Sequence, residues 1–214
     1  MLRRLLPVCL TLVVWGCNKS ASLDRGRTAV APNKDLSSTV AATDKRGSGP
    51  SPIVQVAHLL DENAPFSFNF DVVDVGGKRI SKAELAGKVV IVDLWGTWCP
   101  PCRKEIPHFV ALNKKYRDRG LAIVGLNNEQ TADTADAVAQ VRKFCKSAGV
   151  DYPCAVVGDD LIAQIPGFQG FPTTLFIDRA GQVRLRVTGY HDLPFLEAAV
   201  KALLEEETVA RADG

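Results

Sequence analysis

Two cysteines separated by two prolines, Cys99 and Cys102, are the residues of this chain whose type and spacing most clearly indicate chemistry. They follow an apolar run, residues 89–94, that is typical of a buried strand, and they precede a segment with helical spacing. Backbone N–H groups at a helix start, together with the positive end of the helix dipole, favour a thiolate over a thiol. The pair therefore predicts a redox site in which Cys99 is the nucleophile.

The residues between the cysteines, Pro100 and Pro101, affect the same chemistry. Proline has no backbone N–H, so the N–H of Cys102 and the helix dipole are the main backbone groups left to stabilise a Cys99 thiolate. We expect this thiolate to attack a substrate disulfide and form a mixed disulfide, which Cys102 then resolves. The products are an oxidised protein and a reduced substrate, and both steps are reversible.

Two carboxylates have spacings that place them near the cysteines. Asp93 comes six residues before Cys99, and alternation along the predicted strand places it beneath the site. Glu105 follows Cys102 by three residues, so the two lie on the same face of a helix. A buried carboxyl group has a raised pKa, which suits proton transfer to and from a thiol. The alternatives are a polar strand-end residue for Asp93 and a solvated helix residue for Glu105.

The segments around the site alternate between strand and helix patterns. The composition, 46% hydrophobic and 23% charged in 214 residues, is typical of one globular domain of mixed class. Aromatic residues at alternate positions in 66–70, a Gly-Gly pair and residues 78–80 predict a β-hairpin. Strands are predicted at 89–95, 121–126, 155–157, 174–177 and 182–188, and helices at 99–116 with an interruption at Pro107, 134–147, 160–165 and 193–206. Together they predict an α/β fold with a central mixed sheet covered by helices on both faces.

The first 17 residues differ from the rest of the chain. A basic start precedes an apolar run, residues 5–15, that is too short to span a bilayer, and this layout is that of an export signal. The end of the run resembles a bacterial lipoprotein processing box, in which Cys17 would become the lipidated first residue, although Trp15 departs from that pattern. An ordinary cleaved signal and an uncleaved anchor are the alternatives. All three alternatives for this segment predict that the rest of the chain is extracytoplasmic.

Composition also divides the rest of the chain. Residues 18–52 are small and polar with almost no bulky apolar side chains, which predicts a flexible tether. The predicted folded domain is 53–207, and 208–214 is a predicted disordered tail. The net charge of +2 is close to balance, with basic residues scattered among acidic ones, so the sequence predicts no nucleic-acid partner.

Two separated motifs carry a resemblance to a known family. The runs WGTWCPPCRKEIP, at 95–107, and GFPTTLFIDRAGQV, at 170–183, resemble the thioredoxin superfamily, and more closely the membrane-tethered TlpA/ResA group of bacterial thiol-disulfide oxidoreductases. The similarity covers about residues 65–206, and the helical stretch before Ala155 matches the insertion that distinguishes this group. The resemblance implies a thioredoxin fold with an N-terminal β-hairpin and a central αβ insertion.

The resemblance also implies roles for single residues. It implies that Cys99 is exposed and Cys102 more buried, and that Asp93 and Glu105 act as proton acceptors. Pro172 matches the family's cis-proline, although spacing alone leaves a trans proline at a strand start as the alternative. The residues expected to contact substrate are Trp98, Pro100, Pro101, Phe171 and Pro172.

The function that the resemblance implies is reduction of protein disulfides in the bacterial cell envelope. The partners would be disulfide-containing proteins and a membrane electron donor of thiol-disulfide type, with no cofactor and no metal. One candidate process is cytochrome c maturation, in which the substrate would be a haem-attachment CxxCH pair. The alternatives are a thiol peroxidase, although the position of Thr97 does not match the usual peroxiredoxin pattern, and a copper(I) chaperone, although the chain has no methionine- or histidine-rich motif.

Cys145 and Cys154 are the other thiols of the predicted domain. In an oxidising compartment they could form a structural disulfide, and free buried thiols are the alternative. A zinc site made with Cys99 and Cys102 is a third possibility. It is disfavoured because a nine-residue separation is unlike the usual short ligand spacing.

Overall fold

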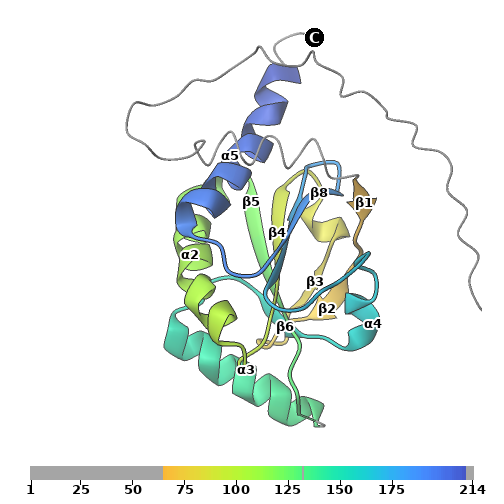
Figure 1. Cartoon of the computed structure of the whole chain (residues 1–214), viewed down its shortest axis with the longest axis vertical. Coiled ribbons are helices and arrows are strands. Elements are labelled where there is room, and N and C mark those ends of the chain that lie inside the picture. The colour runs from red at the N-terminus through yellow and green to blue at the C-terminus, as the bar shows by residue number, and fades with distance from the viewer. Residues whose placement is uncertain (1–64, 132, 211–214) are drawn as a thin grey trace, which may run out of the picture. The chain divides into compact units, whose positions relative to one another are not determined.

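The computed structural model describes residues 65–131 and 133–210 (Figure 1). Six strands form one mixed sheet in the order β1-β8-β7-β4-β5-β6. The export segment with its lipidation candidate Cys17, the tether, the first twelve residues of the predicted folded domain and residues 211–214 lie outside the described residues. The strands of the sheet are β1 (Phe66–Ser67), β4 (Val89–Trp95), β5 (Leu121–Asn127), β6 (Cys154–Val156), β7 (Thr173–Ile177) and β8 (Gln182–Thr188).

Strand β4 lies between β5, which is parallel to it, and β7, which is antiparallel. All seven of its residues are buried, as expected for an apolar strand that is covered on both faces. On the far side of β5, strand β6 is also parallel, and β8 and β1 continue the sheet beyond β7 in antiparallel pairing. The predicted central strand and the predicted mixed α/β architecture are confirmed.

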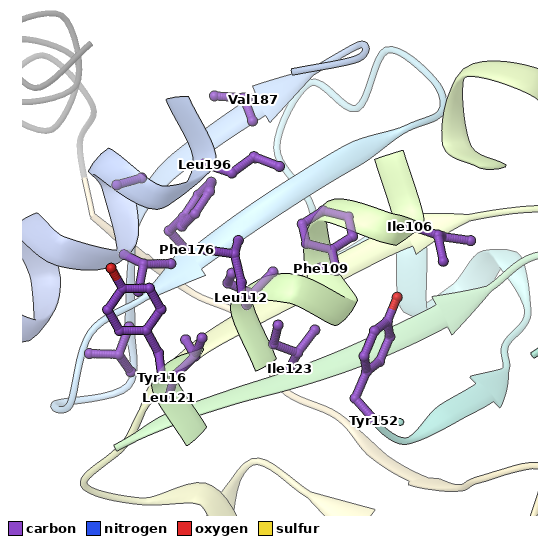
Figure 2. Packing of buried hydrophobic residues seen from close by; sticks show 14 of the residues in the cluster. Ile106, Phe109, Leu112, Tyr116, Leu121, Ile123, Tyr152, Phe176, Val187 and Leu196 are labelled. Atoms are coloured by element: carbon purple, nitrogen blue, oxygen red, sulfur yellow. The ribbon is translucent and has the colours of Figure 1, made fainter. Parts of the chain in front are cut away.

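Helices cover one face of this sheet. Figure 2 shows Ile106, Phe109 and Leu112 of one helix packed over Ile123 of β5 and Phe176 of β7. The same buried cluster includes residues of the C-terminal helix and of the helix between β5 and β6. The helices are α2 (Pro100–Tyr116), α3 (Thr134–Ala148), α4 (Asp159–Ile162) and α5 (Leu193–Ala210), with two 3-10 turns, η1 (Ala83–Leu85) and η2 (Arg117–Arg119).

The opposite face of the sheet is covered by the N-terminal segment and by α4. Alternate residues of β4, Val90 and Val92, pack here, whereas Ile91 packs on the helical face. The covering residues are Phe68, Phe70, Ile80, Ile162 and Ile165.

The N-terminal hairpin is displaced from its predicted position. It joins β2 (Asp71–Val73) to β3 (Arg79–Ser81), whereas the alternating aromatic residues precede it. Phe66 belongs to β1, which pairs with β8 of the main sheet, and Phe68 and Phe70 are buried against the sheet face. The alternation therefore reflects packing on the sheet and not pairing within the hairpin.

Helix α2 is continuous, so the predicted interruption at Pro107 is wrong. This proline cannot donate a backbone hydrogen bond to the carbonyl of Arg103. The helix continues because its apolar face is buried against the sheet on both sides of Pro107, at Ile106 and Phe109. Helix α5 also runs further than predicted, to Ala210, and so includes the first three residues of the predicted tail.

Helix α3 and β6 form the insertion predicted between the two motifs. Asp133 caps α3, because its Oδ1 accepts hydrogen bonds from the N–H groups of Ala135 and Asp136 at 2.7 and 3.1 Å. The helix ends at Gly149, whose left-handed backbone (φ 67°) suits glycine. The insertion adds β6 to the sheet and brings α3 next to the residues that follow β4.

Candidate active site

Cys99 and Cys102 form a disulfide at the start of α2. Cys99 occupies the N-cap position, and the backbone N–H of Cys102 donates to its Sγ at 3.3 Å. Cys99 is only 3% exposed and Cys102 1% exposed, so the implied exposure of Cys99 is wrong for this oxidised form. Both sulfur atoms belong to the buried cluster on the helical face of the sheet, against which the side chain of Phe171 also packs.

The loop before β7 lies beside the disulfide. The Phe171–Pro172 peptide bond is cis, and the ring of Phe171 contacts that of Trp98 edge to face with 5.5 Å between centroids. Phe171 also contacts Phe168 at 5.2 Å. Trp98 is 39% exposed, and Pro100 beside it is exposed. The residues predicted to contact substrate therefore lie at one end of the sheet, where the start of α2 meets the loop before β7; of these, Pro101 is exposed and Pro172 is buried.

Glu105 is buried on the inner face of α2, three residues after Cys102. Its Oε1 accepts a hydrogen bond from the backbone N–H of His191 at 2.9 Å, and Oε2 has no partner among the described residues. Burial raises the pKa of Glu105 to about 7, although the His191 N–H favours the charged form. Glu105 is therefore not a solvated helix residue.

Asp93 is buried in the middle of the sheet, on the face that α2 covers. Neither of its carboxylate oxygens has a hydrogen-bond partner within residues 65–131 and 133–210. Burial, and then the negative charge of Glu105, raise the pKa of Asp93 well above its usual range. Two carboxyl groups with raised pKa values thus lie behind the disulfide, and their roles in proton transfer remain predictions.

The neighbour of Asp93 in β5 is Gly125, which in turn pairs with Cys154 in β6. A Cβ atom at Gly125 would lie 2.8 Å from the Cys154 Sγ, so a larger residue would displace that thiol. Because Gly125 has no side chain, Asp93 and Cys154 face each other across it. The charge of Asp93 contributes to a raised pKa of Cys154.

The structural disulfide predicted between Cys145 and Cys154 is not formed, because both cysteines are free and buried. Cys145 lies in the last turn of α3, and Cys154 begins β6. The neighbouring Cys145 side chain, and then burial, raise the pKa of Cys154 well above its ordinary value. Both cysteines are therefore free buried thiols, which is the alternative prediction. The Cys154 side chain lowers the pKa of Cys145, so burial is what limits the reaction of that thiol.

We expect Cys145 and Cys154 to resist alkylation in the folded protein and to react in guanidinium without any reductant. Burial should slow their reaction with iodoacetamide at least about 100-fold relative to the same two cysteines in guanidinium. Peptide mass spectrometry measures the labelling at each cysteine. A need for reductant before labelling in guanidinium would show that the two thiols are paired after all.

Sequence reasoning missed two groups beside the site. The backbone N–H of His191, after β8, binds Glu105, and the side chain of Glu129, after β5, binds Thr97 in the loop before Cys99. Nothing in the sequence indicates the first contact. The second contact could have been expected from the sequence, because β4 and β5 are parallel and end at the same edge of the sheet. The residues that follow the two strands therefore lie close together.

An α/β fold in which a disulfide begins a helix beside a cis-proline loop defines a redox-active protein of the thioredoxin superfamily. Residues 59–203 match the Redoxin family, and the chain belongs to that family. The protein is an enzyme, a thiol-disulfide oxidoreductase, and its predicted similarity to the TlpA/ResA group is confirmed.

Named relatives agree with this assignment. The chain is 35% identical over 135 residues to the thiol-disulfide oxidoreductase ResA of Bacillus thuringiensis (strain Al Hakam), covering 63% of this chain and 75% of the relative. It is 36% identical over 121 residues to ResA of Bacillus subtilis (strain 168), covering 56% and 64%. A solved thiol:disulfide interchange protein of Chlorobium tepidum TLS superposes with a TM-score of 0.59 at 32% identity, covering 67% of this chain and 99% of that one.

Proposed function

We propose that the protein reduces disulfides of substrate proteins outside the cytoplasm, with Cys99 and Cys102 as its electron-donating dithiol. The observation that carries this proposal is the disulfide at the start of α2, where the Cys102 N–H faces the Cys99 Sγ beside the exposed Trp98 and the half-buried Phe171. This arrangement supplies a stabilised nucleophile and a place for a peptide to bind next to it.

In the first step the Cys99 thiolate attacks one sulfur of a substrate disulfide. A bond forms between Cys99 and that sulfur, the substrate S–S bond breaks, and the other substrate sulfur leaves as a thiolate. The Cys102 N–H and the helix dipole stabilise the attacking thiolate. The product is a mixed disulfide between Cys99 and the substrate.

In the second step Cys102, as a thiolate, attacks the Cys99 sulfur. The Cys99–Cys102 disulfide forms, the substrate leaves with two thiols, and two electrons have passed from the enzyme to the substrate. The proton of the Cys102 thiol needs an acceptor in a buried site. Glu105 suits this role because its pKa of about 7 allows it both to take and to release a proton, and Asp93 lies behind it as a second buried carboxyl.

The exposed surface beside the disulfide indicates how a substrate would bind. Trp98, Phe171 and Phe168 form a connected aromatic surface, which suits an apolar or extended peptide segment. The backbone of Phe171 precedes the cis-proline and is available to pair with such a segment, as a strand pairs at a sheet edge. Pro100 and Pro101 contribute apolar surface on the other side.

The setting of the reaction is part of the same proposal. The N-terminal export pattern supports a location in the cell envelope, with Cys17 as the attachment point of a lipid anchor and 18–52 as the tether. Re-reduction then requires a membrane donor of thiol-disulfide type, and the CxxCH pair of an apocytochrome c is a candidate substrate. Within the part of the chain that the structure describes, no helix is long and apolar enough to cross a membrane.

Trapping of the mixed disulfide tests the substrate class. The Cys102→Ala variant should remain covalently joined to its substrates through Cys99, because no second thiol is present to release them. We expect dithiothreitol-sensitive adducts in the envelope fraction of the native host, identified by mass spectrometry. The Cys99→Ser/Cys102→Ala variant is the matched control and should trap none. Absence of adducts with the single variant would contradict a protein substrate, and adducts without c-type cytochromes would contradict the maturation role alone.

A further inference from the structure

The loop that joins β4 to α2 carries Cys99 and is held by the segment that follows β5. The backbone N–H of Asn128 donates to the Trp95 carbonyl at 2.9 Å, and the Asn128 carbonyl accepts from the Trp98 indole N–H at 2.9 Å. Gly96 permits this arrangement, because a Cβ atom there would lie 2.5 Å from the indole nitrogen of Trp98. The backbone before Cys99 is therefore attached on both sides of Gly96.

The next residue, Glu129, binds the same loop through its carboxylate. One oxygen accepts from the Thr97 backbone N–H at 2.8 Å and from the Asn127 amide at 2.9 Å. The other accepts from the Thr97 hydroxyl at 2.9 Å and from the Gln140 amide of α3 at 3.1 Å. Gln140 also donates to the Thr97 hydroxyl at 2.5 Å. Four donors on one half-buried carboxylate make a network of charge-assisted hydrogen bonds, which are stronger than neutral ones.

We propose that Glu129 is a positioning residue for the thiol chemistry, acting through Thr97 to hold Cys99 at the start of α2; this rests on the proposed function of Cys99 as nucleophile. Thr97 is two residues before Cys99, and within the described residues the Glu129 side chain binds both the Thr97 N–H and the Thr97 hydroxyl. Helix α3, the insertion of this fold, contributes Gln140 to the network. The insertion thus has a direct structural link to the reactive loop.

Removal of the Glu129 carboxylate can change the pH at which Cys99 reacts in two opposite ways, one through charge and one through the position of Cys99. Loss of a negative charge near a thiol favours the thiolate, so Cys99 would react at lower pH. Loss of position moves Cys99 away from the Cys102 N–H and the helix dipole, so it would react at higher pH. A role that concerns stability alone would leave this pH profile unchanged.

The experiment measures the rate at which iodoacetamide alkylates Cys99 in the reduced, full-length protein, peptide by peptide and as a function of pH. In Glu129→Ala the midpoint of the profile should rise by about one pH unit, which makes alkylation at pH 7 about tenfold slower. Glu129→Gln keeps an oxygen that accepts from Thr97, so its midpoint should stay at or below that of the wild type. Asp133→Ala is the matched control, because it removes a carboxylate that caps α3 without contacting the loop, and its midpoint should not move.

An unchanged or lowered midpoint in folded Glu129→Ala would overturn the proposal. If that variant does not fold, Thr97→Val removes the hydroxyl bonds with little change of shape, and it should raise the midpoint by a smaller amount; no rise would again overturn the proposal. Alkylation does not depend on turnover. A wild type that fails to reduce insulin while Glu129→Ala still shifts the profile would therefore reject the proposed function and support the role of Glu129.

Discussion

Cys99→Ser is expected to lower the rate of insulin disulfide reduction at least about 10³-fold, to nearly the uncatalysed rate. A serine hydroxyl at the same N-cap position is almost wholly protonated at neutral pH, so it cannot replace the thiolate that attacks the substrate disulfide. The neighbouring Cys102 lies within the first turn of α2 and lacks the N-cap position at which a backbone N–H faces the Cys99 Sγ, so we do not expect it to take over the attack. The assay follows insulin reduction with dithiothreitol as the electron donor.

The controls for this experiment separate chemistry from folding. Cys145→Ala removes a buried thiol that the proposed reaction does not use, so it should keep the wild-type rate per folded molecule. Full activity in Cys99→Ser would reject Cys99 as the nucleophile. Rapid consumption of peroxide by the wild type would instead favour a thiol peroxidase, and tight stoichiometric binding of copper(I) by reduced Cys99 and Cys102 would favour a copper chaperone.

Glu105→Gln is expected to stabilise the oxidised protein at pH 8 by about 3 kcal/mol and to have little effect at pH 4. The pKa of Glu105 is about 7 in the folded protein against an ordinary value of 4.5. Between these pH values the folded state holds a proton that the unfolded state has lost, so the free energy of unfolding falls as pH rises. The full fall is about 3 kcal/mol, and it is absent from the variant because an amide does not titrate.

Urea unfolding of both proteins from pH 4 to pH 8 measures this effect. Glu197→Gln is the control of opposite sign, since hydrogen bonds from Lys115 and Tyr116 lower the pKa of Glu197. Removal of the Glu197 carboxylate should lower the free energy of unfolding at pH 8 and leave it unchanged at low pH. An equal pH dependence in wild type and Glu105→Gln would show that Glu105 has an ordinary pKa. Asp93 should keep a residual slope of the same sign in the variant.

The elements that carry the disulfide could be predicted because their signals are local. The apolar run of β4, the proline-rich start of α2 and the spacing of Asp93 and Glu105 each depend on a few neighbouring residues. The burial of both carboxylates follows from the same periodicities, since α2 covers the sheet face on which Asp93 lies. The motif at 170–183 needed a family resemblance, because one proline does not reveal its isomer by spacing.

The remaining features depend on contacts between distant segments. The aromatic alternation before the hairpin is equally suited to strand pairing and to packing on a sheet, and only the position of β1 beside β8 decides between them. Cys99 belongs to a buried cluster against which Phe171 packs, and Phe171 is 72 residues further along the chain. Free thiols at Cys145 and Cys154 and the contact of Glu129 with Thr97 likewise follow from how α3 and β6 are placed.

The aromatic surface beside the disulfide has a consequence for how such enzymes diversify. Trp98 belongs to the loop before α2, whereas Phe168 and Phe171 belong to the loop between α4 and β7. The sulfur atoms and buried carboxyl groups are held by β4 and α2, so substitutions in the second loop leave the electron-transferring groups in place. Because we propose that this surface binds the substrate, we expect substitutions in the second loop to change partner choice while the redox centre of β4 and α2 is retained.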